Sequence, residues 1–508
     1  MKPSRSAQQG GAALEGTAAA EPAERAAGAM PEVVSWSACE LATAIRSKRV
    51  SCQEVMKAYL GHIERCNPRV NAIVSLRDDD ELLDEAAWRD RQLARGEWLG
   101  WMHGFPHAVK DMALTNGIRT TCGSPLVDLV PEEDDIYVER LRNSGAIIIG
   151  KTNVPEFGLG SQTYNPVFGV TLNAYDPSKT AGGSSGGAAA ALALRMLPVA
   201  DGSDMMGSLR NPAAYNNVIG FRPSYGRVPS GPSPEVFLGQ LSCAGPMARS
   251  VADAAKLLAV MAGADDRAPL SIEQGPEIFA TPLERDCKGT GLGWLGDLGG
   301  YLPMEAGILE LCRNALEAFE GIGCVVEEAR LEFPPERLWH AWVTLRHWLI
   351  AGALGDFYRD PSKRARMKPE AQWEVEGGLK LAAMDVFQAS AARSAWYQAL
   401  RRLFEKYDFL VLPGAQVFPF DATIHWPGEI NGIAMDSYHR WMEVMIPASM
   451  AGCPAISLPA GFDRHQRPMG IQLIGRHHAD FALLQLACAY DQATGWVTRH
   501  LPPSLAGA

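Results

Sequence analysis

The stretch TAGGSSGG at residues 180–187 constrains the fold of this chain strongly, because it sets two adjacent serines between two pairs of glycines. An alanine-rich run, AAAALALRML, follows it directly at residues 188–197. A flexible linker would lead into polar sequence, whereas this run is almost wholly apolar. We therefore expect a rigid loop that feeds a buried helix.

Three familiar glycine-rich loops fit this stretch poorly. A P-loop needs a lysine after its last glycine, where this chain has Ala188. A dinucleotide loop and a G-x-S-x-G nucleophile elbow both follow a strand directly. The residues before this loop, NAYDPSK, instead include Asp176 and Pro177 and are typical of a turn. The literal G-x-S-x-G match from Gly182 to Gly186 is therefore a weak signal.

Predicted strands and helices alternate along the rest of the chain. Ser51 and Glu54 form a capping box that predicts a helix over residues 51–66, and apolar spacing predicts another within residues 303–323. Apolar runs predict the strands, which lie in residues 106–114, 145–153, 324–333, 455–462 and 469–475. This alternation predicts an α/β fold: one large domain with a mostly buried mixed β-sheet flanked by α-helices.

Composition divides the chain into a tail and one domain. Residues 1–30 are rich in alanine, glycine and glutamate and lack the apolar segment of a signal peptide, so we expect a disordered tail before a domain over residues 31–508. Residues from about 263 to 430 form its most variable part and hold many tryptophans, most of which we expect to pack helices rather than line a pocket.

Charge and cysteine content limit which binding partners and which cell compartment we expect. The net charge of −11 is spread along the chain, which disfavours a nucleic-acid binder, and no apolar run is long enough to cross a bilayer. The ten cysteines include no C-x-x-C pair and are expected to be reduced thiols in the cytoplasm. His103 and His107 are four residues apart, but the glycine and proline between them oppose a helix, so we predict no metal and no cofactor.

Two further segments complete a pattern with the glycine-serine loop. Lys110 lies in GFPHAVKDMAL, and Ser208 lies in ADGSDMMGSLRNPAAYNNVIGFRPSYGRVP, 24 residues after Ser184. The three segments, in this order and spacing, resemble the amidase signature family of serine hydrolases. The resemblance runs from the helix LATAIRSKRVSCQEVMKAYLGHIERC to the segments PASMAGCPAISLPAGF and MGIQLIGR near the C-terminus, and is looser between about 263 and 430.

The resemblance implies a catalytic triad with Ser208 as nucleophile, Ser184 as bridging serine with a cis peptide bond, and Lys110 as base. The chemistry is consistent with these residue types. A serine hydroxyl becomes nucleophilic when a neighbour takes its proton, and a lysine can take it only when it is neutral. Burial disfavours the ammonium form, and Lys110 has the apolar neighbours that burial needs.

By the same resemblance, backbone N–H groups of Met205, Met206 and Gly207, with that of Ser208, form an oxyanion hole. The family pattern has a glycine where this chain has Met206. If φ at this residue is positive the methionine is strained, and if φ is negative it is not; we expect the second. We expect Ser203 and Asp204 to support the loop, and Arg210 to form a structural ion pair.

The implied activity is hydrolysis of a carboxylic amide, and of some esters, through an acyl-enzyme. The substrate is expected to be a small amide, hydrophobic or aryl, with no nucleic-acid or membrane partner and with a homodimer left open. The alternatives are the A subunit of a tRNA-dependent amidotransferase, which acts with a partner and a tRNA, and a catalytically silent binding protein. A Ser-His-Asp esterase, which would need an essential histidine, is the most remote alternative.

Overall fold

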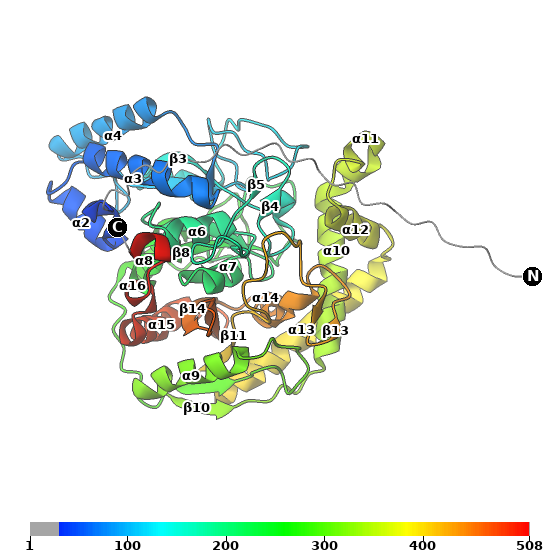
Figure 1. The fold of residues 1–508 in the computed structure, drawn as a ribbon. Coiled ribbons are helices and arrows are strands. Elements are labelled where there is room, and N and C mark those ends of the chain that lie inside the picture. The colour runs from blue at the N-terminus through cyan, green and yellow to red at the C-terminus, as the bar shows by residue number, and fades with distance from the viewer. Residues whose placement is uncertain (1–29, 507–508) are drawn as a thin grey trace, which may run out of the picture.

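An eight-stranded mixed sheet lies at the centre of the computed structural model, which describes residues 30–506 (Figure 1). In spatial order the strands are β10 (Val325–Glu328), β9 (Gly291–Trp294), β11 (Phe409–Pro413), β15 (Pro468–Ile474), β14 (Ala455–Phe462), β7 (Ile219–Arg222), β8 (Cys243–Ala248) and β6 (Ala200–Asp204). The first three run parallel, and every later neighbour pair is antiparallel. Except for β10 the strands are almost wholly buried, which confirms the predicted fold class.

The strand that carries Lys110 lies outside this sheet. Three strands, β1 (Ile73–Val74), β3 (Ile147–Thr152) and β2 (Pro106–Lys110), form a separate small sheet. β2 runs parallel to β3, and both are buried over their full length. The backbone N–H of Lys110 donates to Asp201 Oδ2 on β6 at 3.2 Å, so the end of β2 is tied to the edge of the large sheet.

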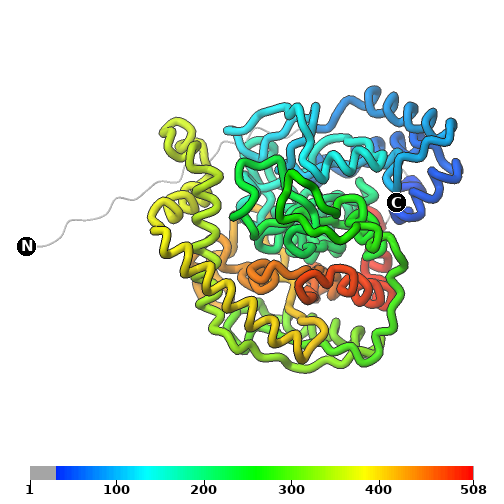
Figure 2. The backbone as a smooth tube through the Cα atoms, turned by 180° about the vertical axis from the view of Figure 1, so that it is seen from behind, coloured from blue at the N-terminus to red at the C-terminus, as the bar shows by residue number. Residues whose placement is uncertain are grey.

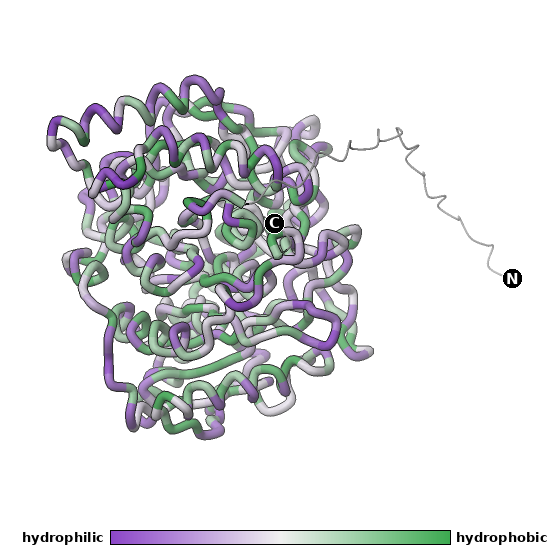
Figure 3. Tube along the Cα trace, turned by 60° about the vertical axis from the view of Figure 1, so that its left-hand side comes forward, coloured by the Kyte–Doolittle hydropathy of each residue, from purple (hydrophilic) through white to green (hydrophobic). Residues whose placement is uncertain are grey.

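Helices surround the sheets. Near the N-terminus they are α1 (Glu32–Ser35), α2 (Ala38–Arg46), α3 (Cys52–Cys66), α4 (Asp79–Ala94) and α5 (Ile136–Asn143). Around the large sheet they are α7 (Arg210–Tyr215), α8 (Val251–Met261), α9 (Ile308–Gly321), α14 (Ile446–Ala451), α15 (Asp480–Thr494), α16 (Trp496–Arg499) and α17 (Pro503–Ala506). Helices at the surface alternate between hydrophilic and hydrophobic stretches, as expected where one face is buried (Figure 3). Two short antiparallel ribbons lie outside both sheets. They are β4 (Tyr164–Asn165) with β5 (Gly169–Val170), and β12 (Glu429–Ile430) with β13 (Ile433–Ala434).

The alanine-rich run forms α6 (Gly186–Ala193), and every residue of that helix is buried, as predicted. A Cβ atom on Gly186 would lie 2.3 Å from Thr163 Oγ1, and one on Gly187 would lie 2.4 Å from Asn153 N. The second glycine pair therefore lets the start of α6 pack directly against neighbouring backbone and side chains. The capping box at the start of α3 is also present, since Ser51 and Glu54 bond to each other's backbone N–H groups.

One side of the molecule is a helical arm, by which we mean α10 (Pro335–Arg359), α11 (Pro361–Arg364), α12 (Pro369–Leu379) and α13 (Ala383–Lys406) (Figures 1 and 2). α10 packs against both α12 and α13. Trp339, Trp342 and Trp396 are buried in the main core, so these arm tryptophans pack helices, as expected. A second, smaller apolar cluster joins the arm to Leu159 and Tyr438.

Candidate active site

Four oxygen atoms surround the amine of Lys110 at the end of β2. Nζ lies within hydrogen-bond distance of Ser184 Oγ at 2.7 Å, of Ser185 Oγ at 2.9 Å, and of the hydroxyl and carbonyl oxygens of Ser203 at 3.0 and 3.2 Å. The two serines from the loop before α6 thus meet a lysine from the small sheet and a serine from β6. The Gly183–Ser184 peptide bond is cis, as the family resemblance implies.

Burial lowers the pKa of Lys110 to about 7, although the nearby carboxylates of Asp201 and Asp204 oppose that shift. Asp201 is bonded to the backbone N–H of the lysine and is completely buried. It accepts hydrogen bonds from Tyr137 Oη at 2.9 Å and from His107 Nε2 at 3.0 Å, as well as from the Lys110 backbone. A buried lysine with a pKa near neutrality is suited to act as a base. His107 is therefore part of this cluster.

The loop that carries Ser208 is held by Asp204, which is also completely buried. Its carboxylate accepts the N–H groups of Gly207 at 2.8 Å and Leu209 at 3.2 Å, and pairs with Arg210 at 3.0 Å and with Arg222. Burial alone would raise the pKa of Asp204, but the two guanidinium groups hold it well below its usual range. Arg210 is thus engaged in an internal ion pair, away from solvent.

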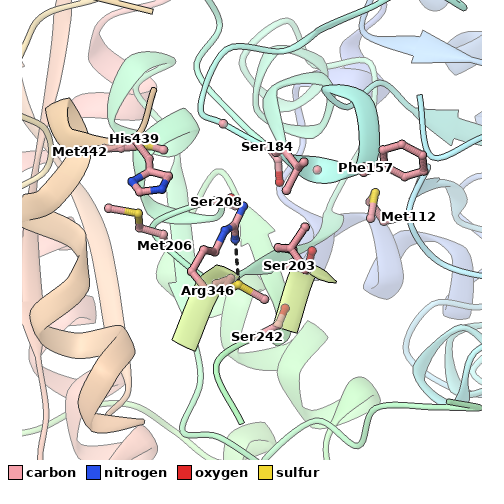
Figure 4. Close-up of a pocket in the computed structure, with 15 residues that line it drawn as sticks. Met112, Phe157, Ser184, Ser203, Met206, Ser208, Ser242, Arg346, His439 and Met442 are labelled. Atoms are coloured by element: carbon pink, nitrogen blue, oxygen red, sulfur yellow. Dashed lines mark hydrogen bonds between the residues drawn. The ribbon is translucent and has the colours of Figure 1, made fainter. Parts of the chain in front are cut away.

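Ser184, Ser203 and Ser208 face one cavity of about 110 Å³ (Figure 4). The cavity is lined by Met112, Phe157, Gly158, Leu159, Gly160, Ser184, Ser203, Met205, Met206, Ser208, Ser242, Arg346, Ile350, His439 and Met442. The walls therefore combine apolar side chains with serines, one arginine and one histidine. Ser208 is partly exposed to this space, and in the described residues no hydrogen bond joins its hydroxyl to that of Ser184.

The backbone at the expected oxyanion hole has a clear pattern. Met206 is not among the residues with positive φ, so the methionine is unstrained, whereas Gly207 has φ 87°. A Cβ atom on Gly207 would lie 2.4 Å from Met445 Cγ, so glycine is required there. The Gly207 N–H is engaged by Asp204. No acceptor within residues 30–506 bonds the N–H groups of Met205, Met206 and Ser208.

The cavity wall on the side of the helical arm, which we call the arm wall, carries two polar residues that the sequence did not indicate. They are Arg346 from α10 and His439. Arg346 Nη1 donates to Met205 Sδ at 2.8 Å, the contact drawn as a dashed line in Figure 4. Its Nε pairs with buried Glu374 at 3.0 Å. Nothing in the sequence separates Arg346 from the other arginines of the arm, so only its neighbours in space reveal its position.

No group of three or more His, Cys, Asp or Glu side chains in residues 30–506 is arranged to hold a metal ion. All ten cysteines are free, and all except Cys39 and Cys122 are buried. None of the helices in the described part of the chain is both long and apolar enough to span a bilayer.

Comparison with known proteins identifies the family. A family model described as Amidase matches residues 54–484. The chain belongs to the amidase signature family. This family member is an amidase signature enzyme, and therefore an amide hydrolase.

Individual relatives of this family member have more than one activity. It is 33% identical to an acylamidase of Rhodococcus erythropolis, over 92% of this chain and 98% of that protein. It is also 33% identical to the A subunit of the glutamyl-tRNA(Gln) amidotransferase of Alkaliphilus metalliredigens, over 90% of this chain and 95% of that protein. Sequence identity therefore does not separate the two activities.

Solved structures of the family share the fold. A bacterial aryl acylamidase superposes with a TM-score of 0.87 at 28% identity, over 93% of this chain and 99% of that one. The peptide amidase of Stenotrophomonas maltophilia superposes with a TM-score of 0.77 at 26% identity, over 92% of this chain and 98% of that one.

Proposed function

We propose that this enzyme hydrolyses a carboxylic amide through an acyl-enzyme on Ser208, with Lys110 as the base and Ser184 as the proton relay. The observation that carries the proposal is the 2.7 Å hydrogen bond from the buried Lys110 amine to Ser184 Oγ, at the edge of the cavity that Ser208 also faces. A pKa of about 7 leaves a substantial fraction of the lysine neutral near neutral pH.

The steps follow from these positions. Neutral Lys110 accepts the proton of Ser184, and Ser184 accepts the proton of Ser208 as the Ser208 oxygen attacks the amide carbonyl. The amine leaves with the proton that returns through the same pair, and an acyl ester remains on Ser208. Water then attacks the ester carbonyl and transfers a proton to the relay, which releases the carboxylic acid and restores the serine.

The oxyanion hole uses backbone donors that the fold leaves without acceptors. The N–H groups of Met205, Met206 and Ser208 fit this role, because no described residue accepts a bond from them. Gly207 was expected to donate as well, but its N–H is committed to Asp204, so Gly207 contributes the turn at φ 87°. The Asp204 network fixes the loop in advance, as electrostatic stabilisation of the transition state requires.

The substrate is an amide with a hydrophobic or aryl body. Seven apolar side chains support this part of the proposal, since all of them line the cavity: Met112, Phe157, Leu159, Met205, Met206, Ile350 and Met442. The printed names of two relatives, an acylamidase and an aryl acylamidase, agree with it. The enzyme works in the cytoplasm, where its free cysteines would stay reduced, and the homodimer remains a hypothesis.

The similarity to the A subunit of an amidotransferase supports a second candidate function. A Ser-His-Asp mechanism has less support. His439 lines the cavity, but burial lowers its pKa to about 3, which makes it a weak base, and within residues 30–506 no hydrogen bond joins it to Ser208.

One experiment tests the leading proposal against both. The purified chain, without partner or tRNA, is incubated with a slowly turned-over aryl amide, and intact-mass spectrometry is used to detect an acyl adduct. We expect release of the aryl amine and an adduct that maps to Ser208. A chain that is inert alone but active with an amidotransferase partner would support the second candidate, and turnover abolished by His439→Phe but retained in Ser208→Ala would support the esterase.

A further inference from the structure

The arm side of the cavity contains a charged group whose hydrogen-bonding capacity is only partly used. A guanidinium carries five N–H donors. In Arg346, Nε donates to Glu374 Oε1 at 3.0 Å, Nη1 to Met205 Sδ at 2.8 Å, and Nη2 to Tyr438 Oη at 3.1 Å. One N–H on each terminal nitrogen has no acceptor among residues 30–506, although the side chain is only 7% exposed.

The acceptor at Nη1 is also a poor one. A thioether sulfur accepts hydrogen bonds weakly, so an oxygen atom in the cavity would compete well for this donor. Figure 4 shows the guanidinium pointing into the cavity, toward the side on which Ser208 and Ser203 lie. Arg346 is therefore placed to contact a molecule bound at the nucleophile.

A second polar group, whose ring makes no hydrogen bond within residues 30–506, lies in the same wall. The side chain of His439 is 1% exposed, and neither ring nitrogen has a hydrogen-bond partner in the described part of the chain. Burial lowers its pKa to about 3, so the ring is neutral, with one donor and one acceptor nitrogen. Buried polar groups are normally paired, so the ring nitrogens at this cavity wall are available to hydrogen-bond a bound molecule.

The carboxylate of Glu374 determines whether a charged or an uncharged ligand group can bind beside Arg346. Its carboxylate is completely buried and contacts Arg346 at 3.0 Å, His347 Nδ1 at 2.9 Å and His439 Nε2 at 3.6 Å, and it accepts a bond from Tyr438 Oη at 2.6 Å. It therefore already neutralises Arg346. A second carboxylate beside Arg346 would place two anions around one cation in a dry site, which is unfavourable.

The geometry points to Arg346 and His439 as a subsite for a second, uncharged carbonyl oxygen of the substrate, remote from the amide that is cleaved. This inference rests on the proposed function and narrows it to amides whose apolar body carries another carbonyl group. Arg346 donates to that oxygen in place of Met205 Sδ, and the neutral His439 ring adds a donor nearby. The subsite selects among substrates and takes no part in the chemical steps.

Matched anilides test the inference. Three probes have the same chain length: the anilide of levulinic acid, the anilide of its methyl-branched isostere isocaproic acid, and the monoanilide of succinic acid. The keto and branched anilides are also made with an acyl chain one carbon longer. All release aniline, so only the terminal group of the acyl chain differs. We expect kcat/KM for the keto anilide to exceed that of its branched isostere on the order of tenfold or more at one of the two lengths, as for a hydrogen bond to a charged donor.

Variants assign that preference to its residues. Arg346→Lys keeps the charge beside Glu374 but loses the planar fork, and should bring the ratio close to one while the branched anilide is still hydrolysed. His439→Phe keeps the ring shape and should lower the ratio by a smaller factor. Arg359→Gln is the control, because Arg359 lies at the end of the same helix, is exposed and pairs with Asp356.

Two further measurements keep the outcome decisive. If Arg346→Lys does not fold, the double variant Arg346→Gln/Glu374→Gln removes both charges together and replaces it. Binding of the keto and branched anilides to Ser208→Ala, measured by calorimetry, should show the same preference without turnover. The inference is overturned by a ratio near one at both chain lengths, by a ratio unchanged in the Arg346 variants, or by a preference for the succinic anilide. Aniline release by Ser208→Ala would instead overturn the proposed function.

Discussion

The two walls of the cavity differ in how their polar residues are bonded. On the wall formed by β2, β6 and the loop before α6, each buried charge has several partners: Lys110 contacts three serines, and Asp204 contacts two backbone N–H groups and two arginines. On the arm wall, Arg346 has unused donors and His439 has no hydrogen-bond partner within residues 30–506. A network in which every polar group is hydrogen-bonded fixes the positions of its side chains, whereas donors without acceptors can bind a ligand. Under the two proposals, the residues that react and the residues that select the substrate thus lie on separate walls.

Variants of the reacting groups on the first wall should lower activity more than variants of any residue on the arm wall. Ser208→Ala should keep the fold and lower kcat on the order of a thousandfold or more, since it removes the nucleophile. Ser184→Ala and Lys110→Ala should be nearly as damaging, and the double variants hardly worse than the single ones, because the three act as a unit. Steady-state kinetics with a common anilide, with thermal melting as the control for folding, provide the measurement. Losses that add up across the variants would show that the residues act separately.

The first wall was largely predictable from sequence and the second was not. Lys110, Ser184 and Ser208 lie in short motifs with fixed spacing, and the capping box of α3 and the buried α6 follow from local patterns. Arg346 and His439 are 93 residues apart in the chain, and Glu374, which contacts both, lies on a third segment. The same limit explains why β2 was not assigned to a separate sheet: strand periodicity shows that a strand is buried but not which strand it pairs with.

The pH dependence should follow the first wall alone. Because the base must be neutral and the pKa of Lys110 is about 7, activity should rise with pH through that value, and fall about tenfold per pH unit well below it. The profile of kcat/KM for a substrate without titrating groups reports this limb of the free enzyme. Arg346→Lys should leave the limb in place. A flat profile between acidic and alkaline pH would remove Lys110 as the base.

A shift of this limb of the pH profile in the variant Asp201→Asn should identify Asp201 as a residue that acts through Lys110. Its carboxylate lies next to Lys110 and favours the ammonium form, which raises the pKa of the lysine against the effect of burial. Asp201→Asn removes that charge and still offers an oxygen to the Lys110 backbone N–H, so the limb should move to lower pH. At a pH one unit below the native limb, the variant should retain more of its maximal activity than the native enzyme. An unmoved limb with lower activity at every pH would mean that Asp201 acts only through structure.

Met206 lies where the two walls meet and should give the smallest effect on turnover. Its φ is not positive, so replacing it with glycine relieves no strain, and the buried side chain, 4% exposed, is lost from the core. Met206→Gly should therefore lower the free energy of unfolding by about 2–4 kcal/mol, as a truncated core methionine plus a freer backbone would. It should reduce kcat only a few-fold, because the N–H that we propose to face the oxyanion remains while its position is held less firmly. Since the side chain lines the cavity beside Ser208, bulkier acyl groups should become better substrates relative to small ones. Chemical denaturation and kcat/KM over a series of acyl anilides measure both effects, with Met206→Ala as the matched control that keeps the backbone restricted. If the glycine variant were more stable and more active, with the same acyl range, the loop would be strained at this residue after all.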